Sequence, residues 1–444
     1  MTLTLGFVAL ARPTFDVALA QEVTEQARAL LSTAGFTLEG PTGLVSTMET
    51  ARAAAEDLCA RPLDALVIFQ ATFADSSLAM ALAEALTGPI VLWAVPEART
   101  GGRLRLNSFC GINLAAHSLK RAGREYDYLY APADDARVLP RLRAWAQAGL
   151  VYRRLRSTRL GRFGENPAGF GPCELDAAGL QRHFGVEVRR YGLEDLFAQI
   201  QAMPAAEVER VLTPLRGRVA GLDALDAAAT RRTLAAYLAL QAEAQRAGLQ
   251  GLAVRCWPEF FTELGCAACA AMSLLSDEGL PCSCEADING TVTQLALQWL
   301  SDAPAFGTDV VGFDEAENTA TLWHCGLAPL SMADEQSTPR GTIHSNRKLP
   351  LLMEFPLKPG PVTLARLHAG AEGWRLVVGR GEMLRAPLSF SGTSGVLRLE
   401  SPVRQVMDTI ITQGLDHHVS LTYGDVLEPL LLLARLWQVE VIRL

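Results

Sequence analysis

Acidic residues follow two segments of the sequence that have the character of buried β-strands. One segment is Leu252-Ala-Val-Arg-Cys-Trp-Pro-Glu259, and the other is Pro281-Cys-Ser-Cys-Glu-Ala-Asp287. Ligands of open α/β sheets collect at the carboxyl ends of the strands, so the carboxylates of Glu259 and Asp287 could meet there. An isolated acid in such a position is more often a solvated turn residue or a helix cap. Two such strand ends in succession favour a shared site.

A histidine near the carboxyl terminus supplies a third candidate group. His417 lies in Gly414-Leu-Asp-His-His418, between a helix-like segment and a strand that begins at Val419. One imidazole and two carboxylates form a hard donor set that suits Mn²⁺, Mg²⁺ or Co²⁺ and leaves positions for water or substrate oxygens. The Asp-His-His run also occurs in metal phosphoesterases, so another metal enzyme that uses this segment is an alternative. The additional Asp and His clusters that a two-metal hydrolase needs are not evident.

The cysteines offer a competing metal site. Cys266-x-x-Cys269 and Cys282-x-Cys284 have spacings that superficially suggest zinc. However, Cys266 and Cys269 lie within Phe260–Leu275, an apolar stretch of helical character. We therefore expect them to be small core residues.

The elements that would position these groups begin with an α/β domain at residues 1–150. Apolar strands at Thr4–Leu10, Ala65–Gln70 and Ile90–Ala94 alternate with Ala-rich segments of helical period at Leu19–Ala34, Met48–Ala60 and Ser77–Leu86. Such alternation predicts a Rossmann-like parallel sheet with helices on both faces. No GxGxxG motif follows the first strand, so dinucleotide binding is unsupported.

Two further domains are expected. A middle Rossmann-like α/β domain at residues 151–345 carries the acidic residues, and in it Asp226 caps a long helix that ends near Gly248. A β-rich domain at residues 346–444 carries the histidine. Its segment Leu351–Leu399 has short alternating strands separated by Gly- and Pro-rich turns, which predicts an antiparallel barrel or sandwich.

Composition narrows the class of partner. The chain has 444 residues, a formal charge of −8 and 49% apolar residues, so it lacks the basic stripe that nucleic acids or anionic membranes require. A small-molecule partner is expected. The start of the chain lacks a signal-peptide pattern, and the apolar run Leu430–Leu433 is too short to span a bilayer. We expect a cytoplasmic protein with its nine cysteines reduced.

Several segments resemble the L-fucose isomerase family, which is similar in active-site architecture to L-arabinose isomerase. They are Cys284-Glu-Ala-Asp-Ile-Asn-Gly290, Ala305-Phe-Gly-Thr-Asp309, Thr321-Leu-Trp-His-Cys-Gly326 and Gly414-Leu-Asp-His-His418. The resemblance implies isomerisation through a cis-enediol, with a divalent cation, Mn²⁺ first and Mg²⁺ or Co²⁺ as alternatives. It carries Asp287 and His417 over as metal ligands. Glu259 is the expected third ligand, with Glu263 as its fallback and His418 as the fallback for His417.

These residue types suit that chemistry on general grounds. A cation that spans O1 and O2 stabilises the enediolate, while a nearby carboxylate carries the proton between C1 and C2. Glu259 and Asp287 would divide the acid and base roles, and which does which stays open.

Other side chains would select the sugar. Trp257 or Trp323 would face its ring or chain, His344 and Asn346 would bind hydroxyls, and Arg12 or Arg347 would bind an anion at C6. Since some relatives of the family act on sulfonated hexoses, conversion of sulfoquinovose to sulfofructose stands beside L-fucose and arabinose as a candidate reaction. The family also implies a homo-oligomer such as a hexamer, with active sites between subunits. A non-catalytic sugar-binding protein of the same fold is the alternative.

Overall fold

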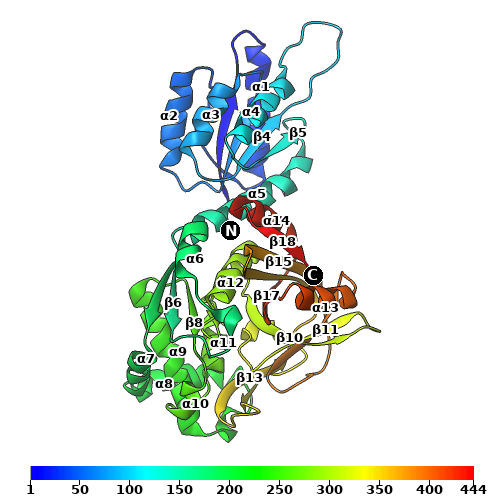
Figure 1. The fold of residues 1–444 in the computed structure, drawn as a ribbon. Helices are drawn as coiled ribbons and strands as arrows, with labels where there is room; N and C mark the ends of the chain where they lie inside the picture. The colour runs from blue at the N-terminus through cyan, green and yellow to red at the C-terminus, as the bar shows by residue number, and fades with distance from the viewer. Residues whose placement is uncertain (1) are drawn as a thin grey trace. The chain divides into compact units, whose positions relative to one another are not determined.

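The computed structural model describes residues 2–444, which form two compact units (Figure 1). Unit 1 comprises residues 1–154 and 428–438, and unit 2 comprises residues 155–427 and 439–444. The expected first boundary at residue 150 lies close to the end of the first segment of unit 1. Between residues 2 and 444, no helix combines the length and the apolar character that a membrane span requires.

Unit 1 is built on a five-stranded parallel sheet with the order β2-β1-β3-β4-β5. Its strands are β1 (Thr4–Leu10), β2 (Thr37–Glu39), β3 (Ala65–Gln70), β4 (Ile90–Ala94) and β5 (Tyr126–Tyr130). Its helices are α1 (Val17–Thr33), α2 (Met48–Cys59), α3 (Ser76–Ala85), α4 (Ser108–Arg121), α5 (Leu139–Leu155) and α14 (Leu427–Trp437). Continuous apolar runs form the central strands because both of their faces are buried. The predicted parallel-sheet domain is confirmed.

Unit 2 contains a second parallel sheet with the order β7-β6-β8-β9. Its strands are β6 (Arg159–Phe163), β7 (Glu187–Tyr191), β8 (Gly251–Val254) and β9 (Cys282–Ser283). Its helices are α6 (Ala177–Phe184), α7 (Leu193–Gln201), α8 (Ala205–Leu215), α9 (Ala227–Ala247), α10 (Glu259–Thr262), α11 (Cys269–Asp277) and α12 (Ile288–Ser301). As expected, the Asp226 carboxylate caps α9 by accepting from the Ala229 N–H, and Gly248 ends the helix in a left-handed conformation.

The expected single helix over Phe260–Leu275 is wrong in one respect. The chain forms α10 and α11 there, and the segment between them turns at Gly265, whose φ is +65°. Glycine adopts this conformation at no steric cost, so it interrupts an otherwise helical apolar run. Cys266 therefore lies in a connection, and Cys269 begins α11.

The antiparallel region of unit 2 is a closed six-stranded barrel. Around the barrel the strands run β16-β11-β10-β17-β14-β15, and β15 pairs again with β16 to close it. They are β10 (Phe306–Asp314), β11 (Thr319–His324), β14 (Gly360–Gly370), β15 (Gly373–Leu384), β16 (Thr393–Leu399) and β17 (His418–Tyr423). Strands β12 (Arg340–Ile343), β13 (Pro350–Pro356) and β18 (Glu440–Arg443) extend the sheet, and helix α13 (Val403–Thr412) precedes β17. The predicted antiparallel barrel is confirmed.

The barrel begins earlier in the chain than the expected boundary at residue 346, because β10 and β11 belong to it. The turn between these strands, Asp314-Glu-Ala-Glu-Asn318, contains no glycine or proline that would mark a hairpin. Asn318 adopts the left-handed conformation instead, with φ +54°. Helix α12 packs against β8 and β9 of the parallel sheet and against β10, β14 and β17 of the barrel. The start of α12 therefore lies where the two sheets of unit 2 meet.

Candidate active site

Three side chains converge where the parallel sheet of unit 2 meets the barrel. Glu285 follows the carboxyl end of β9, Asp309 lies in β10, and His418 is the first residue of β17. In the barrel Asp309 is the direct antiparallel partner of both His418 and Trp323. Residues directly opposite each other in an antiparallel pair project to the same face of the sheet. The register of the barrel thus brings an acid and a histidine together from distant parts of the chain.

The imidazole Nε2 of His418 lies between two carboxylates. It is 3.7 Å from Glu285 Oε2 and 3.6 Å from Asp309 Oδ1. Asp309 Oδ1 is buried and has no hydrogen-bond partner among residues 2–444. A buried polar atom without a partner is uncommon in folded proteins and calls for an explanation such as a bound ion or water.

A strained turn directs the Glu285 side chain toward His418. Glu285 and Ala286 both adopt left-handed backbone conformations, with φ +58° and +55°. Such conformations cost a non-glycine residue about 1 kcal/mol or more, and they persist at functional sites where the surroundings hold them. The Ala286 N–H donates to the Val254 carbonyl at 3.1 Å, and Arg162 Nε donates to the Ala286 carbonyl at 3.3 Å.

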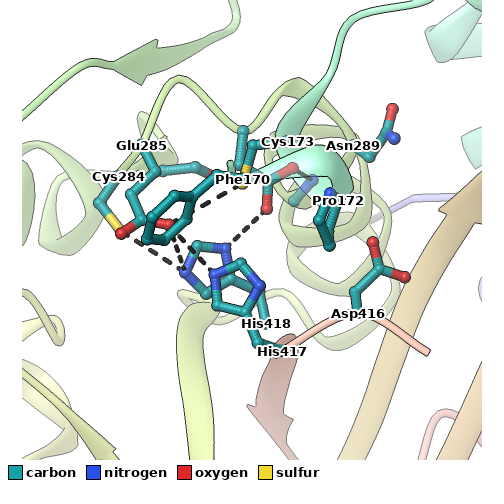
Figure 2. Close-up of polar contacts among 12 residues, drawn as sticks. Phe170, Pro172, Cys173, Cys284, Glu285, Asn289, Asp416, His417 and His418 are labelled. Carbon is teal, nitrogen blue, oxygen red and sulfur yellow. Dashed lines mark hydrogen bonds and ion pairs between the residues drawn. The ribbon is translucent and has the colours of Figure 1, made fainter. Parts of the chain in front are cut away.

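Glu285 is engaged from two further sides, as Figure 2 shows in part. Trp257 Nε1 donates to its Oε1 at 3.1 Å, and His417 Nε2 lies 3.1 Å from its Oε2. Burial opposes ionisation of Glu285, but His417 and His418 outweigh it and hold its pKa below the ordinary value. Burial likewise opposes protonation of His417, and Glu285 raises the pKa of that imidazole.

Both carboxylate oxygens of Asp287, a predicted metal ligand, contact other groups of the chain. Its Oδ1 accepts from the Gly290 N–H at 2.9 Å and so caps α12. Its Oδ2 lies 2.5 Å from Arg366 Nη1 and 2.9 Å from His418 Nδ1. Burial disfavours the Asp287 carboxylate, yet Arg366 and His418 hold its pKa well below the ordinary range. With both oxygens engaged, this carboxylate holds the His418 ring with Nε2 turned toward Glu285 and Asp309.

Arg366 extends this support to the loop that carries the histidines. Its Nη2 donates to Asp416 Oδ1 at 2.8 Å, and His368 Nδ1 lies 2.5 Å from Asp416 Oδ2. Arg366 and Asp416 side chains are 2% and 3% exposed, so the pair is shielded from solvent and weakly screened. The buried ion pair between Arg366 and Asp416 therefore holds the loop that precedes His417 and His418.

The structure does not bring Glu259 and Glu263 into this cluster. Glu259 accepts from Arg255 Nε at 2.7 Å at the start of α10, and Glu263 is exposed at the end of that helix. Among residues 2–444, neither carboxylate forms a hydrogen bond or ion pair with Glu285, Asp309 or His418. Glu259 has no hydrogen bond or ion pair with Asp287 or His417 among the described residues, and the trio stays a prediction.

Glu285 and Asp309, which were not predicted as site residues, both lie in the motifs that resemble the isomerase family. Cys284-Glu-Ala-Asp287 contains two acids, Glu285 and Asp287, and the family resemblance implies a metal-binding role for Asp287 alone. Asp309 ends the segment Ala305-Phe-Gly-Thr-Asp309. That segment is part of the resemblance, but no metal-binding or catalytic role was predicted for its aspartate. The fallback histidine, His418, is the one that faces both carboxylates.

Five predicted substrate residues line one cavity of about 220 Å³ together with Glu285 and Asp309; they are Trp257, Trp323, His344, Asn346 and Arg347. That volume is below the roughly 300–1,000 Å³ of pockets for drug-sized ligands, which suits a smaller molecule. Arg12 is exposed in unit 1, with its guanidinium 5.7 Å from the Phe73 ring centroid, and is not among the lining residues.

The Arg347 guanidinium lies against the aromatic wall of this cavity. It sits 4.8 Å from the ring centroid of Trp257 and 5.1 Å from that of Phe261, and its Nη1 is 3.3 Å from His344 Nε2. In the part of the chain that the structure describes, no carboxylate forms an ion pair with it. The Trp257 indole contacts both charged residues of the cavity wall. Its Nε1 donates to Glu285, and its ring face lies against Arg347.

Cysteines form part of the same wall. Cys256, Cys269, Cys284 and Cys325 line the cavity, and Cys284 Sγ lies 3.0 Å from His324 Nε2. Cys266 and Cys282 are buried and belong to no candidate metal group among residues 2–444. Cys266 and Cys269 belong to the hydrophobic core, as expected.

Comparison with known proteins adds an independent line of evidence. Residues 6–155 match the family model described as the N-terminal domain of fucose/sulfoquinovose isomerase. The chain is 33% identical over 444 residues to sulfoquinovose isomerase of Alkalicoccus urumqiensis, covering 100% of this chain and 99% of the relative. It is 29% identical over 440 residues to sulfoquinovose isomerase of Priestia megaterium, covering 98% of each.

A shorter match connects the chain to a second group of isomerases. L-arabinose isomerase of Mycolicibacterium smegmatis is 30% identical over 111 residues, covering 23% of this chain and 22% of that enzyme. The resemblance found in the sequence motifs is confirmed by these matches. The chain belongs to the fucose/sulfoquinovose isomerase family and is a sugar isomerase, an intramolecular oxidoreductase.

Proposed function

We propose that the protein converts sulfoquinovose to sulfofructose through a cis-enediol, with the help of a bound divalent cation. The name shared by relatives that match over the whole chain supports this substrate over arabinose, because the arabinose isomerases match less than a quarter of it. The observation that carries the proposal is that His418 Nε2 lies 3.7 Å from Glu285 Oε2 and 3.6 Å from Asp309 Oδ1, a buried oxygen without a hydrogen-bond partner among residues 2–444.

The donor set fits a hard divalent cation. Glu285, Asp309 and His418 would hold it, with Mn²⁺ as the first choice and Mg²⁺ or Co²⁺ as alternatives. The orphaned Asp309 Oδ1 supports this assignment, since a cation would satisfy it. A bound cation would supply Lewis acidity that stabilises the charge of the enediolate.

We assign the proton transfers to the two carboxylates that face the cavity. Asp309 would carry the proton between C1 and C2 through the carboxylate oxygen that the cation leaves unbound. Glu285, whose oxygens already accept from Trp257 and face His417, would exchange the hydroxyl proton. Glu259 and Asp287 would act through Arg255 and His418, respectively, and touch no substrate.

Arg347 would bind the sulfonate at C6 of the sugar. A guanidinium without a carboxylate partner, lying in the cavity beside His344, is suited to an anion. Trp257 and Trp323 would pack on the apolar faces of the sugar, and His344 and Asn346 would bind its hydroxyls.

We further propose a homo-oligomer in which Arg12 of one subunit reaches the active site of another. The support is the family resemblance. Light scattering on the purified protein would measure the subunit number, and a monomer that is fully active would overturn this part of the proposal.

The test is an isotope-exchange experiment on the purified protein. The protein is stripped of metal, reloaded with Mn²⁺ and incubated in D₂O with sulfoquinovose, L-fucose or L-arabinose. We expect a sulfonated ketose to form and deuterium to appear at C1 or C2, in the Mn²⁺-loaded sample only. Tight binding of sulfoquinovose without exchange would instead support the non-catalytic sugar-binding protein.

A further inference from the structure

We propose that Cys284, His324 and His418 form a second cation site, which binds thiophilic divalent ions such as Zn²⁺. The site would share His418 with the proposed isomerase site. The two sites differ in their remaining ligands, because one offers carboxylate oxygens and the other offers a thiolate and a second imidazole.

The three ligand atoms are already close to the geometry that zinc requires. Cys284 Sγ lies 3.0 Å from His324 Nε2 and 3.7 Å from His418 Nε2, and all three atoms lie within 4.8 Å of one another. Zinc bonds of about 2.3 Å to sulfur and about 2.0–2.1 Å to nitrogen, at tetrahedral angles, place sulfur and nitrogen roughly 3.5 Å apart. Only small side-chain adjustments separate the observed positions from that arrangement.

A buried hollow provides a second, independent indication. A cavity of about 10 Å³ is lined by Cys284, His324 and His418 together with residues of β9 and α12. It has room for one water-sized sphere. The three side chains belong to residues that are only 3%, 6% and 7% exposed, so a large or strongly hydrated ligand is excluded.

The orientation of each ring supports the ligand set. His418 Nδ1 faces the Asp287 carboxylate at 2.9 Å, which leaves Nε2 as the donor to a metal. His324 Nε2 points at Cys284, and its Nδ1 lies 2.8 Å from the Cys325 backbone nitrogen and 3.2 Å from Cys325 Sγ. A cation at Nε2 requires the ring proton on Nδ1, where Cys325 Sγ can accept it. Cys325 and Cys269 lie on the other side of His324, with their sulfur atoms 3.4 Å apart.

Selectivity follows from the donor types. Thiolate sulfur favours zinc and other soft ions, whereas Mg²⁺ and Mn²⁺ prefer oxygen. Binding forms one sulfur–metal bond and breaks the Cys284 S–H bond, and the proton passes to solvent without any change of oxidation state.

Sharing of His418 makes the two sites mutually exclusive. A single Nε2 has one lone pair, so it can bind only one cation at a time. A thiophilic ion at Cys284 would therefore remove a ligand from the isomerase cation. This exclusion rests on the proposed function, whereas binding of the thiophilic ion does not.

Binding is tested with Co²⁺ as the probe on the full-length, metal-stripped protein. Thiolate ligation gives a sulfur-to-cobalt charge-transfer band in the near ultraviolet, which a site of carboxylates and imidazole lacks. We expect this band in the wild type, its loss in Cys284→Ser, and its retention in the matched controls Cys282→Ser and Cys325→Ser. A band that persists in Cys284→Ser, or that disappears in Cys325→Ser alone, would overturn the proposal.

If Cys284→Ser does not fold, the zinc ligands are identified in the wild-type protein by X-ray absorption at the zinc edge. We expect one sulfur and two imidazole nitrogens around zinc, and a shell without sulfur or with two sulfurs would refute the site. In rate measurements, Zn²⁺ inhibition should weaken as Mn²⁺ rises and shift by at least ~10-fold in Cys284→Ser. If the wild type isomerises none of the sugars, the proposed function fails while the cobalt spectrum still decides the thiophilic site.

Discussion

His418 Nδ1 lies 2.9 Å from Asp287 Oδ2, and the same imidazole presents Nε2 to Glu285 and Asp309. Carboxylates that hold a metal-binding histidine in this way fix its tautomer and its ring orientation. Asp287 receives the Arg366 guanidinium on the same oxygen, at 2.5 Å. A buried ion pair at the start of α12 therefore positions a ligand at the start of β17.

From this relationship we expect Asp287→Asn to weaken Mn²⁺ binding by about 10–100-fold. The amide keeps the size of the side chain but withdraws the charge that orients His418 and balances Arg366. Titration calorimetry with Mn²⁺ measures the loss. Asp302→Asn, at the exposed opposite end of α12, is the matched control and should bind Mn²⁺ as the wild type does. Unchanged affinity in Asp287→Asn would refute the positioning role.

Asp309→Asn should lower kcat by at least ~10² while leaving the free energy of unfolding within about 0.5 kcal/mol. The reason is that Asp309 Oδ1 has no hydrogen-bond partner to lose, whereas the proposed cation and the migrating proton both depend on it. Steady-state rates and urea midpoints measure the two quantities. Glu259→Gln is the comparison variant, because its carboxylate contacts Arg255 instead. An inactive Glu259→Gln beside an active Asp309→Asn would restore the ligand that sequence analysis preferred.

Arg347→Gln should lower kcat/KM for sulfoquinovose by about 10–100-fold, since a charge-assisted hydrogen bond contributes about 1.5–3 kcal/mol. The same variant should change kcat/KM for an uncharged aldose by less than about threefold, because no anion is present to be recognised. Lys348→Gln removes the neighbouring exposed cation and should leave both values unchanged. Equal losses on charged and uncharged sugars would point to a structural role for Arg347 in packing against Trp257.

The strands of unit 1 were predictable because apolar and helical segments alternate locally along that part of the chain. Strands β1, β3 and β4 have the predicted bounds, since an apolar run between helical segments leaves little choice of limits. The start of the barrel was not predictable, because the turn at Asn318 carries no glycine. The approach of Asp309 to His418 depends on strand register in a closed barrel, and register between segments more than a hundred residues apart leaves no local trace.

The choice between Glu285 and Asp287 was equally beyond the sequence. Both acids follow the same strand, and the consecutive left-handed residues Glu285 and Ala286 decide which one faces the cavity. Residues other than glycine rarely adopt that conformation. Because neither Glu285 nor Ala286 is a glycine, the turn could not be predicted from the residue types. Arg366, which engages the other acid, lies 79 positions away in the barrel.

Unit 1 should show an acid-sensitive stability that depends on Asp127. This carboxylate is 5% exposed, accepts from Arg141 at 2.6 and 2.9 Å, and also accepts from Trp145 Nε1. Burial alone would raise its pKa, but Arg141 and Trp145 outweigh burial and lower the pKa below the ordinary value of 3.8. A carboxyl group with a depressed pKa stabilises the folded state fully above its unfolded value, and the contribution is lost as pH falls through the folded pKa.

Asp127→Asn should therefore reduce the free energy of unfolding by about 1.5–3 kcal/mol at pH 7, and the difference from wild type should shrink as the pH falls below 3.8. Urea midpoints, followed by circular dichroism between pH 7 and about pH 3, measure this convergence. Asp57→Asn serves as the control, because the Asp57 side chain is 50% exposed beside Arg61 and exposed pairs contribute at most about 1 kcal/mol. Lower pH removes the charge of Asp127 by protonating its carboxylate. If the difference in free energy of unfolding between wild type and Asp127→Asn stays constant across this range, Asp127 stabilises unit 1 through its shape and its charge contributes nothing.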